Sequence, residues 1–151
     1  MRAAASRVRE SADAFGDRHT QPDPSTGEEW DRGQVLSHIA EFLPYWVEQF
    51  EGVVAAGGAG QAFGRTKQTP SRLARIESGR HHSDSELLGE MDAGIDRAVA
   101  FIRNLKSADS TLEGTHSTRG RMTVAAAFEE FVVAHLEQHA DQLEGRPAPP
   151  A

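Results

Sequence analysis

The sequence predicts an all-α protein, built as a four-helix bundle within one domain. Four long segments carry apolar residues at helical spacing. No segment shows the strict alternation of apolar and polar residues that is typical of a half-buried strand. The chain has 151 residues, which is enough for a single core. Four helices of similar length pack as a bundle, and two long connections between them allow a crossover topology.

The first expected helix covers residues 2–19, with small apolar side chains on one face. The second covers residues 31–54 and has the clearest start signal in the chain. Asp31 is a suitable N-cap, and Gln34 can bond back to it as a capping box. A broad apolar stripe then continues to Val54 and marks the buried side of this helix.

The connection 57–82 is expected to hold a short extra helix, with Thr69 as its cap and Gly79 as its stop. The third long helix is expected over residues 83–105, with Ser83 as its cap. Both expectations follow from local capping signals on either side of an apolar repeat.

A polar loop, residues 106–121, leads to the fourth long helix, which is expected over residues 123–143. The helical domain is therefore expected to cover residues 1–145. The Pro-rich tail, residues 146–151, is expected to be disordered.

Composition excludes several classes of function. Sixteen Lys and Arg against 23 Asp and Glu give a net charge of −7, so a nucleic-acid partner is not expected. The absence of cysteine excludes disulfides and a cysteine nucleophile, so any thiol chemistry requires a small-molecule thiol. The sequence shows no signal peptide and no apolar run long enough for a membrane span, which predicts a cytoplasmic protein without a membrane partner.

Three histidines on two of the expected helices are the main functional signal. His135 and His139 are four residues apart, so their side chains share one helix face, about 6 Å apart. His38 lies on the apolar side of the second helix. Three imidazoles can hold one divalent metal ion and leave coordination positions open, which is the arrangement of a catalytic site.

The direction of the helices decides whether these imidazoles can meet. At a rise of about 1.5 Å per residue, His38 lies about 10 Å after the start of its helix. His135 and His139 lie about 10 Å before the end of theirs. The metal interpretation therefore predicts that the second and fourth long helices are antiparallel, since parallel helices would separate the ligands by about 10 Å. The alternative is that each histidine is a core residue with satisfied nitrogens.

Basic residues gather in the connection 57–82, against the net charge of the chain. Arg65 and Arg72 from this stretch, and Arg121 before the fourth long helix, are candidates for binding the carboxylates of an acidic substrate or of a thiol cofactor beside the metal. The alternative for each of them is a solvated loop arginine.

Two polar residues are candidates for orienting the imidazoles through their second nitrogens. Glu41 lies one turn after His38, and Gln142 lies three residues after His139. His116 falls in the polar loop and is expected to be exposed.

Two segments carry a family resemblance. Residues 30–41, Trp-Asp-Arg-Gly-Gln-Val-Leu-Ser-His-Ile-Ala-Glu, resemble the second-helix signature of the DinB/YfiT-like superfamily, in which an aromatic residue and a cap precede a helical histidine. Residues 131–143, with the HxxxH pair and the trailing Gln, resemble its last-helix signature. The resemblance implies an up-up-down-down bundle with a divalent metal, zinc or nickel, on His38, His135 and His139. It also implies a relation to thiol-dependent S-transferases and mycothiol-dependent maleylpyruvate isomerases.

We therefore expect a metal-dependent enzyme that activates a small thiol such as mycothiol, or water, for transfer to a small electrophilic substrate or for its isomerisation. Coordination lowers the pKa of either ligand, which yields a nucleophile near neutral pH. No catalytic acid or base stands out in the sequence. The alternative is a non-catalytic metal- or ligand-binding bundle, whose exposed faces support a homodimer.

Overall fold

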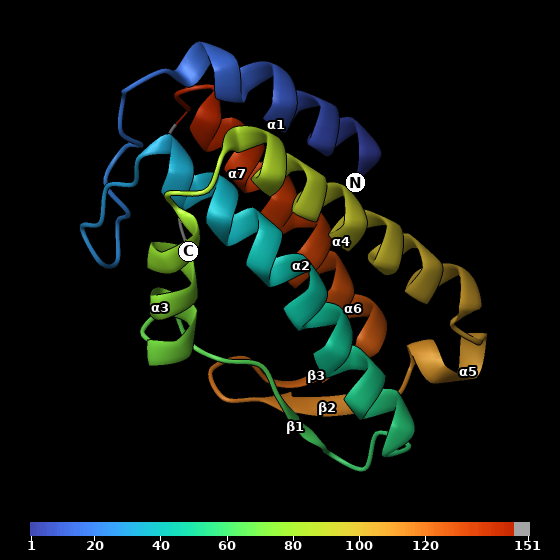
Figure 1. The fold of residues 1–151 in the computed structure, drawn as a ribbon. Helices are drawn as coiled ribbons and strands as arrows, with labels where there is room; N and C mark the ends of the chain where they lie inside the picture. The colour runs from blue at the N-terminus through green and yellow to red at the C-terminus, as the bar shows by residue number, and fades with distance from the viewer. Residues whose placement is uncertain (147–151) are drawn as a thin grey trace.

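The structure, a computed structural model, describes residues 1–146, and it is mostly helical, as the sequence predicts (Figure 1). Four long helical segments lie side by side. They are α1 (Arg2–Phe15), α2 (Arg32–Ala55), α4 (Asp84–Asn104) and one continuous stretch made of α6 (Val124–Phe128), the π-helical segment η1 (Glu129–Ala134) and α7 (His135–Leu143). The tail that is expected to be disordered lies outside the described residues, apart from Arg146.

Helix starts follow the capping signals of the sequence. Asp31 accepts a hydrogen bond from the backbone N–H of Gln34 at 2.8 Å, and the Gln34 side chain accepts one from the N–H of Asp31 at 3.1 Å. Ser83 caps α4 in the same way, and Thr123 caps α6. The first helix is shorter than expected, because Gly16 has a φ of 62° and ends it after Phe15.

Ion pairs and ring contacts define the directions of the helices. Arg32 pairs with Asp84 and Arg97 pairs with Glu51, so α2 and α4 are parallel. α1 is antiparallel to α4, since Arg2 pairs with Asp96. The contacts of α2 with the last stretch have the opposite order: His38 meets His135, while Trp46 stacks on Phe131 further along α2.

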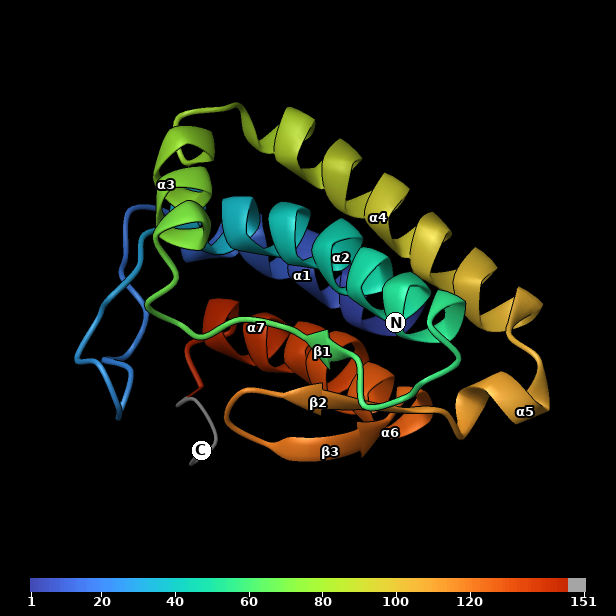
Figure 2. The same ribbon diagram turned by 90° about the horizontal axis from the view of Figure 1, so that it is seen from below.

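The antiparallel arrangement required by the metal interpretation is therefore confirmed. The order up-up-down-down is wrong: α1 and the last stretch point one way, and α2 and α4 point the other way (Figures 1 and 2). The connection between α1 and α2, residues 16–31, reverses the chain. The long connection through α3 instead carries the chain back to the level at which α2 begins.

A small sheet corrects the all-α expectation. β2 (Glu113–His116) and β3 (Gly120–Thr123) form an antiparallel hairpin, and β1 (Ala62–Phe63) pairs with β2 in parallel. The sheet lies beside α6, at the end of the bundle where α2 ends (Figure 2). Strands of two to four residues are too short to show a recognisable alternation of side chains.

Two short helices complete the described chain. α3 (Pro70–Gly79) forms where the sequence predicts a short helix, and it packs against α2. Its Ile76 is buried, whereas Leu73 is exposed. α5 (Ser107–Ser110) was not expected. Within residues 1–146, no helix combines the length and the apolar character that crossing a bilayer demands.

Candidate metal centre

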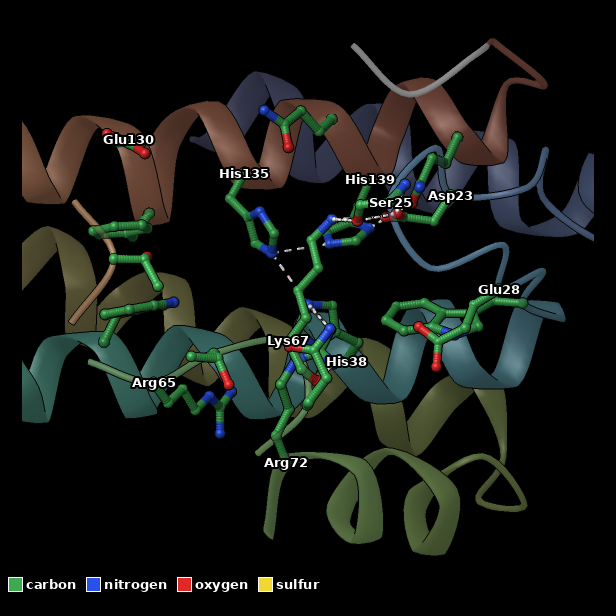
Figure 3. A pocket seen from close by; sticks show the side chains of 18 of the residues that line it. Asp23, Ser25, Glu28, His38, Arg65, Lys67, Arg72, Glu130, His135 and His139 are labelled. Atoms are coloured by element: carbon green, nitrogen blue, oxygen red, sulfur yellow. Dashed lines mark hydrogen bonds and ion pairs between the residues drawn. The ribbon is translucent and has the colours of Figure 1, made fainter. Parts of the chain in front are cut away.

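Three imidazoles meet in the gap between α2 and α7 (Figure 3). The Nε2 atom of His135 lies 3.1 Å from Nε2 of His38 and 3.2 Å from Nε2 of His139. One ring nitrogen from each of the three residues lies within 4.8 Å of the other two. His38 and His139 are buried, and His135 is half-buried. The helical spacing of His135 and His139 and the antiparallel packing of α2 together produce this cluster.

The outer nitrogens of two imidazoles are held by oxygen acceptors. His38 Nδ1 lies 2.9 Å from a carboxylate oxygen of Glu41, and His139 Nδ1 lies 2.7 Å from the amide oxygen of Gln142. An oxygen acceptor requires the proton on Nδ1. The Nε2 lone pairs of both rings therefore point into the cluster. The acceptors beside the Nδ1 atoms are Glu41 and Gln142, the two candidates that the sequence offers for orienting the imidazoles.

The donor set fits a divalent metal ion. When the proton of His135 is on Nδ1, its Nε2 lone pair faces those of His38 and His139 at 3.1 Å and 3.2 Å, and a cation between the three nitrogens removes their repulsion. Two nitrogens that each bind one ion at about 2.1 Å lie about 3.0 Å apart at a right angle and about 3.4 Å apart at the tetrahedral angle. The separations of His135 Nε2 from the other two nitrogens fall between these two values, and all three nitrogens lie within 4.8 Å of one another. The cluster therefore has nearly the spacing that a common ion requires.

Burial keeps these imidazoles neutral, which is the form that binds a metal. Burial lowers the pKa of His38 well below its usual range, and the neighbouring His139 and Arg72 lower it further. The pKa of His135 is lowered in the same way, first by burial. Burial also lowers the pKa of His139 to about 4, although the hydrogen bond with Gln142 opposes this shift. Protons therefore compete weakly for the nitrogens at neutral pH.

Arg65 contacts the same carboxylate oxygen of Glu41 that faces His38. Its guanidinium pairs with the Glu41 carboxylate and lies 3.8 Å from the centre of the Tyr45 ring. Burial raises the pKa of Glu41, and the Arg65 charge opposes this shift. Arg65 therefore helps to keep the orienting carboxylate ionised.

Arg72 reaches the cluster from α3. Its side chain is buried, with Nη1 donating to the backbone carbonyl of Lys67 at 2.8 Å. Nη2 lies 3.5 Å from Nε2 of His38, and the guanidinium lies 5.4 Å from the centre of the Trp30 ring. Burial lowers the pKa of Arg72, and Glu41 opposes this shift.

The cluster forms part of the wall of a pocket of about 520 Å³. On one side, Lys67 pairs with Asp23 at 2.8 Å, which joins the two loops that border the pocket (Figure 3). On the other side lie aromatic rings and more polar groups. These residues include Trp46, His116, Arg119, Glu130 and Phe131.

The hairpin changes two expectations. His116 is buried rather than exposed, because β2 carries it into the pocket wall, where its ring stacks on Phe131 at 4.9 Å. Arg121 lies on β3, where it is exposed, pairs with Glu113 and does not line the pocket of the histidines. Trp30 was not chosen from the sequence as a site residue, yet its ring packs edge-on against His38. The aromatic position before the cap of α2 was the available signal for it.

Comparison with known proteins gives a family and a fold. The sequence model of the DinB superfamily matches residues 1–143. Two solved structures resemble the chain, each with a TM-score of 0.64 over 98% of this chain: the mycothiol-dependent maleylpyruvate isomerase, at 16% identity, and its histidine-to-alanine variant, at 13% identity. The chain spans 61% of the length of these proteins. No curated protein matches the sequence.

Proposed function

Because this chain belongs to the DinB superfamily, we propose that it is a metal-dependent enzyme that uses a small thiol to modify or isomerise a small electrophile. The single observation that carries this proposal is the convergence of His38, His135 and His139, with Nε2 of His135 lying 3.1 Å and 3.2 Å from Nε2 of the other two. His38, His135 and His139 are the proposed ligands, and zinc or nickel is the proposed ion, since imidazole suits both metals.

A divalent ion with three protein ligands lowers the pKa of a coordinated thiol or water, which supplies a nucleophile near neutral pH. The protein's own residues do the remaining work. Glu41 and Gln142 hold the imidazoles in the tautomer that binds a cation. The buried ring of Trp46 and the half-buried ring of Phe131 limit the access of water to one side of the pocket.

Two further observations support a thiol as the second component. The chain contains no cysteine, so it carries no thiol nucleophile of its own. The similar solved structures are of a mycothiol-dependent isomerase, which supports mycothiol or a related low-molecular-weight thiol as the compound to test first. A pocket of about 520 Å³ has the size of a small-molecule site.

The first test is the metal content of the purified protein. We expect about one divalent ion per chain in the wild type and none in H135A, while H82A, which removes a half-exposed histidine outside the pocket, keeps the ion. A metal-free wild type that takes up no added zinc or nickel would contradict the proposed site.

The second test is turnover. The metal-loaded protein is expected to convert an electrophile from a panel of α,β-unsaturated acids and alkyl halides when a thiol is added, and to lose this activity with a chelator. A bound metal without turnover across the panel would favour the alternative, a non-catalytic metal-binding bundle.

A further inference from the structure

Three of the four cationic side chains that line the pocket have a carboxylate partner of their own, and Arg72 is the fourth. Among residues 1–146, no carboxylate oxygen lies within ion-pairing distance of its guanidinium. Of the carboxylates that line or border the pocket, three are engaged by the other cations. The pairs are Arg65 with Glu41, Lys67 with Asp23, and Arg119 with Glu130. The fourth, Glu28, is exposed and accepts a hydrogen bond from Thr26 rather than from Arg72.

Burial makes this missing partner significant. Arg72 is only 7% exposed, so water screens its charge poorly. Its two polar contacts are with neutral acceptors, the Lys67 carbonyl and the Nε2 lone pair of His38. Buried charges in proteins are generally paired, because an unpaired charge away from water is costly. The counter-charge of Arg72 is therefore expected from a ligand of the pocket.

We propose that Arg72 is the anion-binding residue of this pocket and that the substrate carries a carboxylate, which lies between the Arg72 guanidinium and the metal ion. This inference rests on the proposed metal site and assigns the class of substrate to it. Arg65 is excluded from the same role, because it is already bound to Glu41 and stacked on Tyr45.

The contact with His38 explains why an anion is needed beside the ion. Arg72 Nη2 lies 3.5 Å from the nitrogen lone pair that a metal ion would take. Once that lone pair is engaged, the Nη2 hydrogens lose their acceptor, and two cations lie close together in a buried site. A carboxylate between them accepts the free hydrogen bonds and neutralises the repulsion.

The test uses the full chain loaded with Co²⁺, whose visible absorption reports on ligands near the ion. Acetate is the carboxylate probe, and acetamide is the neutral probe of the same shape. In the wild type, acetate is expected to perturb the cobalt spectrum and acetamide is not. In R72Q, the acetate affinity is expected to fall about tenfold or more, because a hydrogen bond to a charged group is lost.

Two variants keep the result interpretable. R119Q removes an arginine of the same pocket that has its own carboxylate, and it is expected to bind acetate with wild-type affinity. R72M, whose unbranched apolar chain fits the buried position, replaces R72Q if the latter does not take up cobalt. A thiol without a carboxylate, 2-mercaptoethanol, is expected to bind the wild type and R72Q with similar affinity.

The outcomes separate the two proposals. A wild type that binds no cobalt overturns the metal site itself. A cobalt protein that ignores acetate, or a cobalt-loaded Arg72 variant with wild-type acetate affinity, overturns the role of Arg72 and leaves the metal site standing. Equal losses of acetate and 2-mercaptoethanol in R72Q would assign Arg72 to the thiolate and would also overturn the carboxylate assignment.

Discussion

Glu41 lies between the histidine cluster and Arg65. Its carboxylate accepts the Nδ1 hydrogen of His38 and pairs with Arg65, and only 5% of its side chain is exposed. A buried carboxylate behind a ligand imidazole fixes the ring orientation and raises its basicity. The imidazole of His38 therefore depends on Glu41 both for its orientation and for its tautomer.

This dependence gives a prediction at the scale of one residue. In E41A, the Nδ1 proton of His38 loses its acceptor, and metal affinity is expected to fall about 10–100-fold. Competition of the protein with a chromogenic zinc chelator measures the change. E48A, which removes an exposed carboxylate from the same helix, is the matched control. Equal zinc affinities in E41A and E48A would show that Glu41 does not orient the ligand.

Spacing within one helix decides where the two orienting candidates lie relative to the histidines. Glu41 and Gln142 each follow a histidine by three residues, and each lies against that histidine's ring. Arg121 and His116 depend instead on the hairpin of β2 and β3, which was not expected. Their positions follow from the register of that hairpin, in which His116 pairs with Gly120 and Thr115 pairs with Arg121.

At the scale of the element, the start of α2 controls the position of His38. Asp31 forms the capping box with Gln34, and its carboxylate also pairs with Arg80 at the end of α3. The Asp31 carboxylate thus lies where the loop with Trp30 meets α2, the helix that carries His38. It also contacts Arg80, directly after α3, the helix that carries Arg72.

D31A is therefore expected to lower the free energy of unfolding by about 1–2 kcal/mol, because it leaves the first-turn N–H groups of α2 without a side-chain acceptor. D31N keeps that acceptor and removes only the charge opposite Arg80, and it is expected to cost less than about 1 kcal/mol, since this ion pair is partly exposed. Urea denaturation of the metal-free proteins measures both values. A D31N variant as unstable as D31A would assign the effect to the ion pair rather than to the cap.

Capping explains why helix boundaries were predictable and why other elements were not. A cap is a contact between residues three positions apart, so the sequence itself contains it. The parallel pairing of β1 with β2 joins residues about 50 positions apart, and such pairings leave no local pattern. The π-helical segment Glu129–Ala134 also could not be predicted, because its apolar residues continue the pattern of a normal α-helix into His135.

At the scale of the whole molecule, the antiparallel relation of α2 and α7 was predictable because the metal interpretation demanded it. The relative direction of α1 and α2 was not predictable, because the sequence contains no pair of residues on these two helices that must meet. The ion pairs that define the remaining directions, such as Arg32 with Asp84, lie on partly exposed surfaces, where the pattern of apolar residues carries no information.

Burial of three neutral imidazoles also makes the stability of the whole molecule depend on pH. His139 has a pKa of about 4 in the folded protein against 6.5 in the unfolded chain. Between these two pKa values the unfolded chain binds more protons than the folded protein does. The contribution of His139 to the stability of the folded protein is therefore fully present above pH 6.5 and is lost as the pH falls toward 4. Without metal, His139 alone is expected to lower the free energy of unfolding by about 2 kcal/mol between about pH 7 and pH 5. His38 and His135 act in the same direction, because burial lowers their pKa values too.

Urea denaturation in the presence of a chelator measures this loss of stability. H139N has no imidazole to protonate at this position, so it is expected to lose correspondingly less stability between about pH 7 and pH 5. Identical pH profiles for H139N and the wild type would mean that the imidazole of His139 is already solvated and protonated in the folded protein, which would contradict its burial in the cluster.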